Sequence, residues 1–213
     1  MKSDPKDAYS MILAAIDSGI YKRGEKLVES ELADRFSMSR TPIREALQRL
    51  ETQSLLSRDG RSLVVASLDH NQMAELYVVR AELEGLAAFL AATNATAEEV
   101  RVLRGMIEKD RALLGDPNAM AQGNRRFHRQ LHLASHNMFL VQQLDLVYRS
   151  MALLATTSLA VEGRGEQALI EHTRIVNAIE DHDSGAARAA LCDHISQAYE
   201  ARLARVAAED PDF

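Results

Sequence analysis

Residues 29–55 constrain the fold of this chain more than any other stretch, because they predict two short helices separated by a tight polar break. In the first helix, Leu32, Ala33 and Phe36 are spaced three and four residues apart and so share one apolar face. The break is residues 37–39, where serine side chains can cap the start of a second helix. Two amphipathic helices joined this closely predict a helix-turn-helix unit.

The second helix of this unit has one apolar face and one face rich in arginine. Pro42 lies in its first turn, where a helix tolerates proline because the amides there lack partners. The apolar face consists of Ile43, Ala46, Leu47 and Leu50, and the outer face carries Ser39, Arg40, Thr41, Arg44 and Arg49. Hydroxyl and guanidinium groups near a helix N-terminus match base edges and phosphates, so this face predicts a DNA recognition helix. The alternative is a helical hairpin whose arginine face is simply solvated.

A short hairpin is predicted directly after the second helix. Two strand-like runs, residues 55–58 and 62–65, are connected through Asp59-Gly60, a dipeptide that favours a tight hairpin turn. The basic residues Arg58 and Arg61 flank that turn. A hairpin in this position is typical of a wing, whose tip lies over the DNA backbone or the minor groove.

Three pieces of this region together resemble one protein family. They are Glu29-Ser-Glu-Leu-Ala, Ser39-Arg-Thr-Pro-Ile-Arg-Glu-Ala-Leu and the Asp59-Gly60 turn, and they resemble the winged-helix domain of GntR-family bacterial transcription regulators. The resemblance implies DNA contacts at Ser39, Arg40, Thr41, Arg44 and Gly60, with Ser30 and Arg49 near phosphates. Together with Arg58 and Arg61 of the wing, these residues form the predicted DNA-binding set.

The remainder of the chain is predicted to be helical. One helix at about residues 8–18 completes an N-terminal domain of three helices and a hairpin, residues 1–68. Residues 69–213 predict six helices and no strand, at about 70–92, 97–114, 118–136, 138–159, 166–182 and 184–208. In the first of these, Val79 and Leu86 are among the apolar residues expected to face inward. The fold class is therefore mainly α, a winged helix-turn-helix followed by an all-helical bundle.

The charge distribution separates these two regions. The net charge of −6 would disfavour nucleic acid if it were spread evenly. Residues 1–69 hold 11 basic and 11 acidic side chains, however, so the acidity belongs to the later region. A single cysteine, Cys192, excludes a disulfide framework within the chain and fits a reducing compartment. No apolar run is long enough to span a membrane, so we expect a cytoplasmic protein.

All seven histidines follow the predicted wing, and three of them invite a chemical interpretation. His128, His172 and His194 lie on three different predicted helices, the last two beside apolar neighbours. Asn124 is four residues before His128 and so shares its helical face. Histidines that project inward from separate helices can converge as metal ligands. Alternatively, each is a hydrogen-bonded structural residue.

Residues 70–213 resemble the all-helical ligand-binding domain called FCD, found in the FadR-type branch of the GntR family. The resemblance rests on Arg80-Ala-Glu-Leu-Glu84, on Phe127-His128, and on His172 with His194. In that family an Asp and three His bind a divalent metal, often zinc or nickel, and the metal binds the carboxylate of a small effector. The resemblance implies a metal site at Asn124, His128, His172 and His194. Asn124 replaces the Asp and brings no charge, so either an anionic effector compensates the ion or the site is metal-free.

Two further residues are candidates for effector binding. Arg80 could hold the effector carboxylate through its guanidinium, or it could form a salt bridge to Glu84 four residues on. His132 extends the row of His128 and either reaches the edge of the pocket or remains partly exposed.

We therefore expect a homodimeric regulator that binds a double-stranded DNA operator and responds to a small carboxylate effector. Repression is the commoner mode in the family that the sequence resembles. No catalytic residues are expected. The alternatives are the same architecture with a metal-free pocket for a lipid or acyl ligand, and a metalloenzyme built on the histidines. The sequence contains no His-Glu-x-x-His element to support the metalloenzyme.

Overall fold

The computed structural model describes residues 7–154 and 157–209, which form two compact units. The first unit takes in the chain up to Leu68 together with the short segment that begins at Tyr148, and the second unit starts at Asp69. The assignment of separate DNA-binding and effector-binding roles to residues 1–68 and 69–213 stays a prediction. No helix among the described residues is long and apolar enough to cross a membrane.

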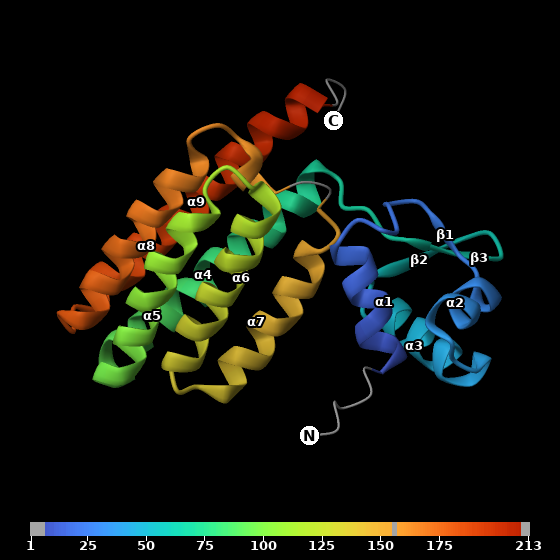
Figure 1. The fold of residues 1–213 in the computed structure, drawn as a ribbon, viewed down its shortest axis with the longest axis horizontal. Helices are drawn as coiled ribbons and strands as arrows, with labels where there is room; N and C mark the ends of the chain where they lie inside the picture. The colour runs from blue at the N-terminus through green and yellow to red at the C-terminus, as the bar shows by residue number, and fades with distance from the viewer. Residues whose placement is uncertain (1–6, 155–156, 210–213) are drawn as a thin grey trace. The chain divides into compact units, whose positions relative to one another are not determined.

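The first unit contains the predicted helix-turn-helix and hairpin (Figure 1). Its elements are α1 (Ala8–Asp17), β1 (Lys26–Leu27), α2 (Glu29–Phe36), α3 (Arg40–Thr52), β2 (Leu56–Asp59) and β3 (Ser62–Val65). Between α2 and α3, Ser37 adopts a left-handed conformation with φ 54°, and Ser39 is the N-cap of α3, although its side chain makes no capping bond. The break therefore lies where the serines predicted it.

The hairpin of the first unit belongs to a small antiparallel sheet. Strand β3 pairs with β2, with Asp59 opposite Ser62, and Gly60 in the connecting turn has the positive φ of 57° that favours glycine there. The sequence did not predict β1, which is two residues long and pairs with the other edge of β3. The core beneath consists mainly of apolar residues from the three helices, including Ile12, Leu32, Ile43 and Leu50.

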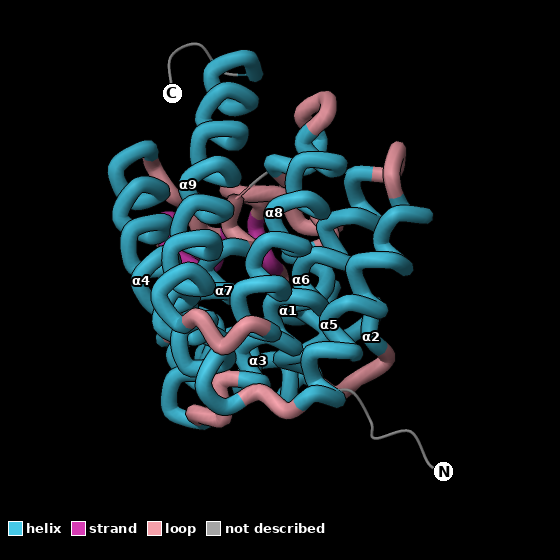
Figure 2. The backbone as a smooth tube through the Cα atoms, turned by 90° about the vertical axis from the view of Figure 1, so that its left-hand side faces the viewer, coloured by secondary structure: helices cyan, strands magenta, loops and turns pink. Residues whose placement is uncertain are grey.

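The second unit is a helical bundle. Its helices are α4 (His70–Asn94), α5 (Ala97–Asp110), α6 (Pro117–Ala134), α7 (Met138–Met151, whose last turn from Tyr148 on belongs to the first unit), α8 (Arg164–Glu180) and α9 (Ser184–Glu209), with 3-10 turns at Arg111–Leu113 and Ser158–Ala160. Helix α9 packs along α4 and against α8, and the three lie next to one another in Figure 2. The described residues thus form the mainly α fold that the sequence predicts.

The buried face of α4 differs from the predicted one. Val79 and Leu86 are 49% and 37% exposed, whereas Arg80 and Glu84 are buried. The other buried positions are Met73 and Tyr77 in the first half of the helix and, after Glu84, only small residues: Gly85, Ala87, Ala88, Ala91 and Ala92. Small side chains let the neighbouring helix approach closely, and the two buried charges satisfy each other. The prediction is therefore wrong for Val79 and Leu86, whereas Met73, which the sequence also placed inward, is buried.

The predicted helix to about residue 159 is also too long, because α7 ends at Met151. The amides of Ala152 and Leu153 donate to the carbonyls three residues back, which tightens the chain into turns. The Thr157 side chain then caps the 3-10 turn at Ser158–Ala160, accepting from the amide of Leu159 at 3.3 Å. Residues 155–156 lie outside the described residues.

Because α4 packs closely on α9, we expect the stability of the protein to be sensitive to a larger side chain at position 85. A Cβ there would lie 2.7 Å from Cys192 Sγ and 3.3 Å from Arg188 Cγ. Gly85→Ala should lower the free energy of unfolding by roughly 1–3 kcal/mol, measured by chemical denaturation. Gly105→Ala on α5 is the control, because its Cβ meets nothing within 4 Å. That change should be neutral or stabilise by up to about 1 kcal/mol. Equal effects of the two variants would contradict the packing argument.

Candidate metal centre and nucleic-acid interface

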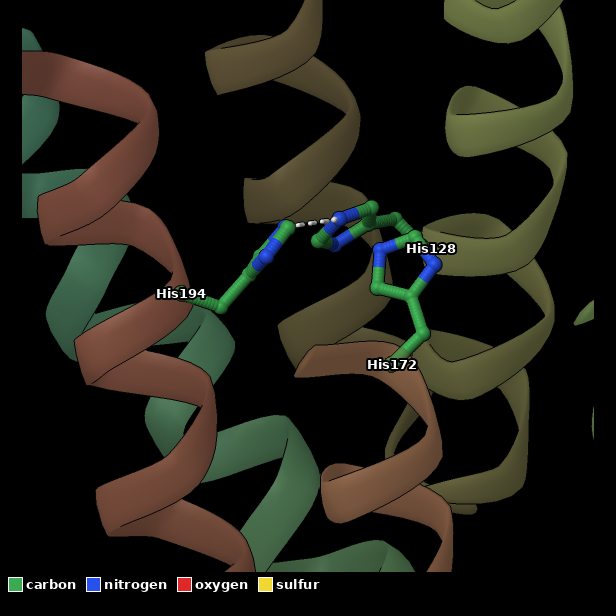
Figure 3. Close-up of side chains that lie close together, drawn as sticks. All are labelled: His128, His172 and His194. Carbon is green, nitrogen blue, oxygen red and sulfur yellow. Dashed lines mark hydrogen bonds between the residues drawn. The ribbon is translucent and has the colours of Figure 1, made fainter. Parts of the chain in front are cut away.

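The three histidines singled out by the sequence lie together in the interior of the second unit (Figure 3). His128 comes from α6, His172 from α8 and His194 from α9, and each is at most 2% exposed. One ring nitrogen from each lies within 4.8 Å of the others. Nε2 of His128 and Nε2 of His194 are 3.1 Å apart, while the ring of His172 stacks on Phe127 at a centroid distance of 3.9 Å.

Two buried carboxylates determine which ring nitrogen of His128 and of His194 carries the proton. Glu84 Oε2 contacts Nδ1 of His128, and Glu171 Oε2 contacts Nδ1 of His194 at 2.6 Å. An ionised carboxylate only accepts, so each Nδ1 carries the proton and donates it. The two Nε2 atoms of neutral rings then present lone pairs to each other across 3.1 Å. Such an arrangement is repulsive unless a cation or a proton lies between them.

The same geometry fits a metal ion. Metal-bound histidines commonly donate their second ring N–H to a carboxylate, which fixes the ring orientation and raises the basicity of the ligand. Two nitrogens 3.1 Å apart, each about 2.0–2.1 Å from one ion, subtend an angle of roughly 100° at that ion. The donor set is therefore chemically suited to a divalent transition metal.

Each carboxylate is itself paired with a buried arginine. Arg80 Nε donates to Glu84 Oε1 at 2.7 Å, and Arg164 NH2 donates to Glu171 Oε2 at 2.8 Å. Two Arg–Glu–His series of side chains, one through Glu84 and the other through Glu171, therefore meet at the two Nε2 atoms in the interior of the second unit. The two arginine charges cancel the two glutamate charges, so the surroundings of the histidines are close to neutral.

The electrostatics keep these groups in the states that metal binding needs. Burial lowers the pKa of His172 and of His194 well below the usual range, and nearby positive groups add to the effect. Burial also lowers the pKa of His128, although Glu84 opposes it. For Glu84, burial would raise the pKa, but His128 and Arg80 outweigh it and hold it well below its usual range. His172 and His194 are therefore neutral near neutral pH, the form in which imidazole binds a metal.

The remaining residues predicted for this site lie as follows. Asn124 is half-buried, one turn before His128. His132 is 3% exposed and contacts Glu84 Oε2 at 3.2 Å, so the alternative of a partly exposed position is wrong. Arg80 forms the salt bridge to Glu84 that the sequence offered as its second interpretation. Glu84, His128 and His132 make up a second group that could hold a metal.

Sequence reasoning missed Glu171 and Arg164. Glu171 directly precedes His172, and the spacing of seven residues back to Arg164 keeps that arginine on the same helical face. A search for Arg and Glu one or two turns apart beside a candidate histidine would have found both.

The predicted DNA-binding residues lie on the helix-turn-helix and its hairpin. Ser39, Arg40, Thr41, Arg44, Arg49, Arg58, Gly60 and Arg61 are exposed, and Ser30 on α2 is half-buried. Arg49 lies over the ring of Tyr9, with Cζ 4.1 Å from the centroid. The structure therefore places Arg49 against α1 as well as on the outer face of α3.

Two arginines of this surface are held by carboxylates. Arg44 Nε and NH2 donate to the two carboxylate oxygens of Glu29 at 3.0 and 2.8 Å, and the pairing lowers the pKa of Glu29. Arg58 Nε and NH2 donate in the same way to Glu51 at 2.6 and 3.1 Å. Both forks present the shape that guanidinium groups use to bind phosphate or guanine, here occupied by a side chain.

A winged helix-turn-helix joined to a helical bundle with a buried histidine cluster defines a class of transcription regulators, and comparison with known proteins gives the family. Residues 5–65 match the domain of bacterial regulatory proteins of the gntR family, and residues 75–197 match the FCD domain. The chain belongs to the GntR family and carries an FCD domain.

Individual relatives agree with this assignment. The chain is 30% identical to the HTH-type transcriptional regulator YdhC of Bacillus subtilis over 192 residues, which cover 88% of this chain and 86% of that protein. It is 32% identical to a probable D-xylose utilization operon transcriptional repressor of Paenarthrobacter nicotinovorans, covering 87% and 82%. The fold is shared with McbR/YncC of E. coli, with a TM-score of 0.82 at 23% identity over 93% and 96% of the two chains.

The lowered histidine pKa values predict that the metal-free protein loses stability in acid. Unfolded histidines titrate near pH 6.5, so below that pH the unfolded state binds more protons than the folded state. Stability should then fall by up to about 1.4 kcal/mol per pH unit for each of His172 and His194. Denaturation of chelator-treated protein between pH 7.5 and 5 measures this slope. His172→Gln should reduce this slope, and a slope equal to that of the wild type would contradict the assignment.

Proposed function

We propose that this GntR-family regulator binds a double-stranded DNA operator as a homodimer through residues 1–68 and senses a small carboxylate through residues 69–213. The proposal includes a divalent ion held by His128, His172 and His194, with Asn124 as a weak fourth ligand. The single observation that carries the sensing part is the 3.1 Å approach of the Nε2 atoms of His128 and His194, whose rings are each held at Nδ1 by a buried carboxylate. A cation between them turns a repulsion into two bonds.

The DNA-binding part of the proposal rests on the exposed N-terminal turns of α3 and on the hairpin. Arg40 and Arg44 are exposed on the recognition helix, and Arg58 and Arg61 flank the turn at Gly60. Base edges in the major groove would be read by α3, and the hairpin would contact the neighbouring backbone. The contact set proposed for the operator is Ser30, Ser39, Arg40, Thr41, Arg44, Arg49, Arg58, Gly60 and Arg61.

Several observations support a dimer that represses. One winged helix buries a small interface with DNA, so two half-sites a helical turn apart supply useful affinity and specificity. Helix α4 exposes apolar side chains at Val78, Val79, Leu86 and Phe89, which suit a contact between two copies. The relative from P. nicotinovorans is named a probable repressor, which favours repression here.

The chemistry of the site favours zinc or nickel as the ion and a carboxylate as the effector. Imidazole nitrogens suit both metals, and the Asn124 amide adds no charge. The buried Arg80–Glu84 and Arg164–Glu171 pairs are each neutral, so the two positive charges of the ion remain uncompensated within the site. An anionic effector would supply that compensation. Because the histidines are almost completely buried, its binding would require part of the helical packing to open, which offers a route to control of DNA binding.

The DNA surface can be tested at Arg44. Arg44→Ala should weaken operator binding by about 1–3 kcal/mol and relax specificity at one base pair, measured by titration at fixed salt. Arg101→Ala is the matched control, because Arg101 is also an exposed arginine paired with a glutamate, Glu98, but lies on α5. If the Arg44 variant bound the operator with unchanged affinity and its fold were intact, α3 would not be the recognition helix.

The metal site can be tested by elemental analysis and thermal shift. His172→Ala should abolish metal uptake and the response to effector while operator binding survives, because the change lies outside residues 1–68. Asn124→Asp should strengthen metal binding, because it returns a negative charge to the ligand set. Protein purified without chelator that contains no metal, and that zinc, nickel and manganese fail to stabilise, would show the site to be metal-free. The histidines would then be hydrogen-bond partners of the effector.

A further inference from the structure

Residues 148–154 belong to the first unit, although they lie within the part of the chain that matches the FCD domain. Leu153 is 2% exposed and is part of the apolar core beneath the helix-turn-helix. In the part of the chain that the structure describes, it is the only buried member of that core from outside residues 1–68. The fold of the first unit is therefore completed by a side chain from the FCD sequence.

A second residue of this segment, Arg149, reaches the ring of Tyr9 on α1. Its Cζ lies 5.8 Å from the ring centre, and Arg49 Cζ on α3 lies 4.1 Å from the same centre. The Tyr9 hydroxyl also contacts the side chain of Gln53, the C-cap of α3. Guanidinium groups are attracted to the face of an aromatic ring, so Tyr9 connects Arg149 with the helix that we propose reads DNA.

Helix α7 connects these contacts with the bundle without a break. Its first half places Leu140 and Leu144 in the core of the second unit. After Met151, three successive amides donate to the carbonyls three residues back, so the chain continues in hydrogen-bonded turns up to Leu154. A shift of α7 would therefore be passed on to Leu153, because packed helices move as rigid elements.

Both sides of the segment lead to the helices that carry the clustered histidines. On one side, α7 follows α6, the helix of His128, after a turn of three residues, 135–137. On the other side, the 3-10 turn Ser158–Ala160 packs against α6, α8 and α9. Because α8 and α9 carry His172 and His194, a change in the spacing of the three histidines would displace both ends of the segment.

We propose that residues 148–154, which we call the coupling segment, transmit the occupancy of the histidine site to the recognition helix. Leu153 would be its anchor in the first unit, and Arg149 would act on α3 through Tyr9. Binding at the histidine site would favour one position of the coupling segment, and the first unit would bind DNA with a different affinity in each position. This inference rests on the proposed function, which assigns sensing to the bundle and DNA binding to the first unit.

The first test needs neither a ligand nor DNA. Urea unfolding of the full-length protein is followed by hydrogen exchange and mass spectrometry, which reports on α3 and α8 separately. In the wild type both helices should lose protection at the same urea concentration, because the coupling segment makes unfolding of the two units cooperative. Leu153→Ala should lower the midpoint for α3 below that for α8.

Leu144→Ala is the matched control for this test. It removes the same volume from a buried position on the same helix, but from the core of the bundle. With the coupling segment intact, it should lower both midpoints together. Two midpoints in the wild type, or a common midpoint in the Leu153→Ala protein, would overturn the proposal.

The second test measures transmission with zinc as the probe. Operator affinity of the full-length protein is titrated at fixed salt with and without zinc, and zinc should change it about fivefold or more in the wild type. Arg149→Gln leaves the core of the first unit in place and should reduce this zinc effect about twofold or more. Arg149→Lys should recover part of the effect, because an ammonium group can also lie over the Tyr9 ring.

The control for the second test is Arg174→Gln on α8, an exposed arginine paired with Asp193, which should keep the wild-type zinc effect. The number of zinc ions bound per chain should be the same in all of these proteins. A full zinc effect in the Arg149→Gln protein would overturn the role of Arg149.

Zinc content, measured on every sample, keeps the two proposals apart. Wild-type protein that binds no zinc would remove the proposed ion, and the urea midpoints, which need no ligand, would decide this inference. Wild-type protein that binds zinc without a change in operator affinity would leave the ion and overturn the transmission. A full zinc effect in the Leu153→Ala protein would leave the sensing function in place and overturn the role of the coupling segment.

Discussion

The second unit depends on two carboxylates that each hold an imidazole by its Nδ1. Glu84 on α4 orients His128 on α6, and Glu171 on α8 orients His194 on α9, so four helices meet through two hydrogen bonds. The bonds are buried, and the loss of either glutamate would leave its arginine as an uncompensated charge in the interior, which typically costs about 3–5 kcal/mol. The packing of the bundle and the geometry of the histidine cluster are therefore set by the same contacts.

Charge balance explains why the network can be buried. Each glutamate lies between a histidine and an arginine, and each Arg–Glu pair is neutral. A metal ion bound at this site would bring positive charge that no residue of the network cancels. A site with an aspartate ligand would absorb part of that charge itself. If Asn124 is the fourth ligand, as proposed, an anion that binds with the ion would have to compensate this charge.

The sequence predicted much of this arrangement, and its failures have physical causes. Helical spacing located the helix-turn-helix, the Asp59-Gly60 dipeptide located the hairpin, and the three histidines converge as expected. Periodicity failed on α4 because it assumes that apolar side chains face inward, whereas Arg80 and Glu84 do so here. It could not reveal β1, whose two residues are defined only by pairing with β3. Glu171 was missed because one glutamate beside a histidine is unremarkable until the fold brings Arg164 and His194 to it.

The carboxylate forks on Arg44 and Arg58 have a consequence for the search for an operator. If Arg44 and Arg58 contact DNA as proposed, random DNA would have to displace Glu29 and Glu51 before its phosphates could take over these hydrogen bonds. Exposed pairs of this kind contribute only about 0–1 kcal/mol each, so a correct site that adds base contacts overcomes them easily. Non-specific DNA offers phosphates alone, so it gains less binding free energy when it displaces the two glutamates. The protein would spend less time on each incorrect site and scan a genome with shorter pauses.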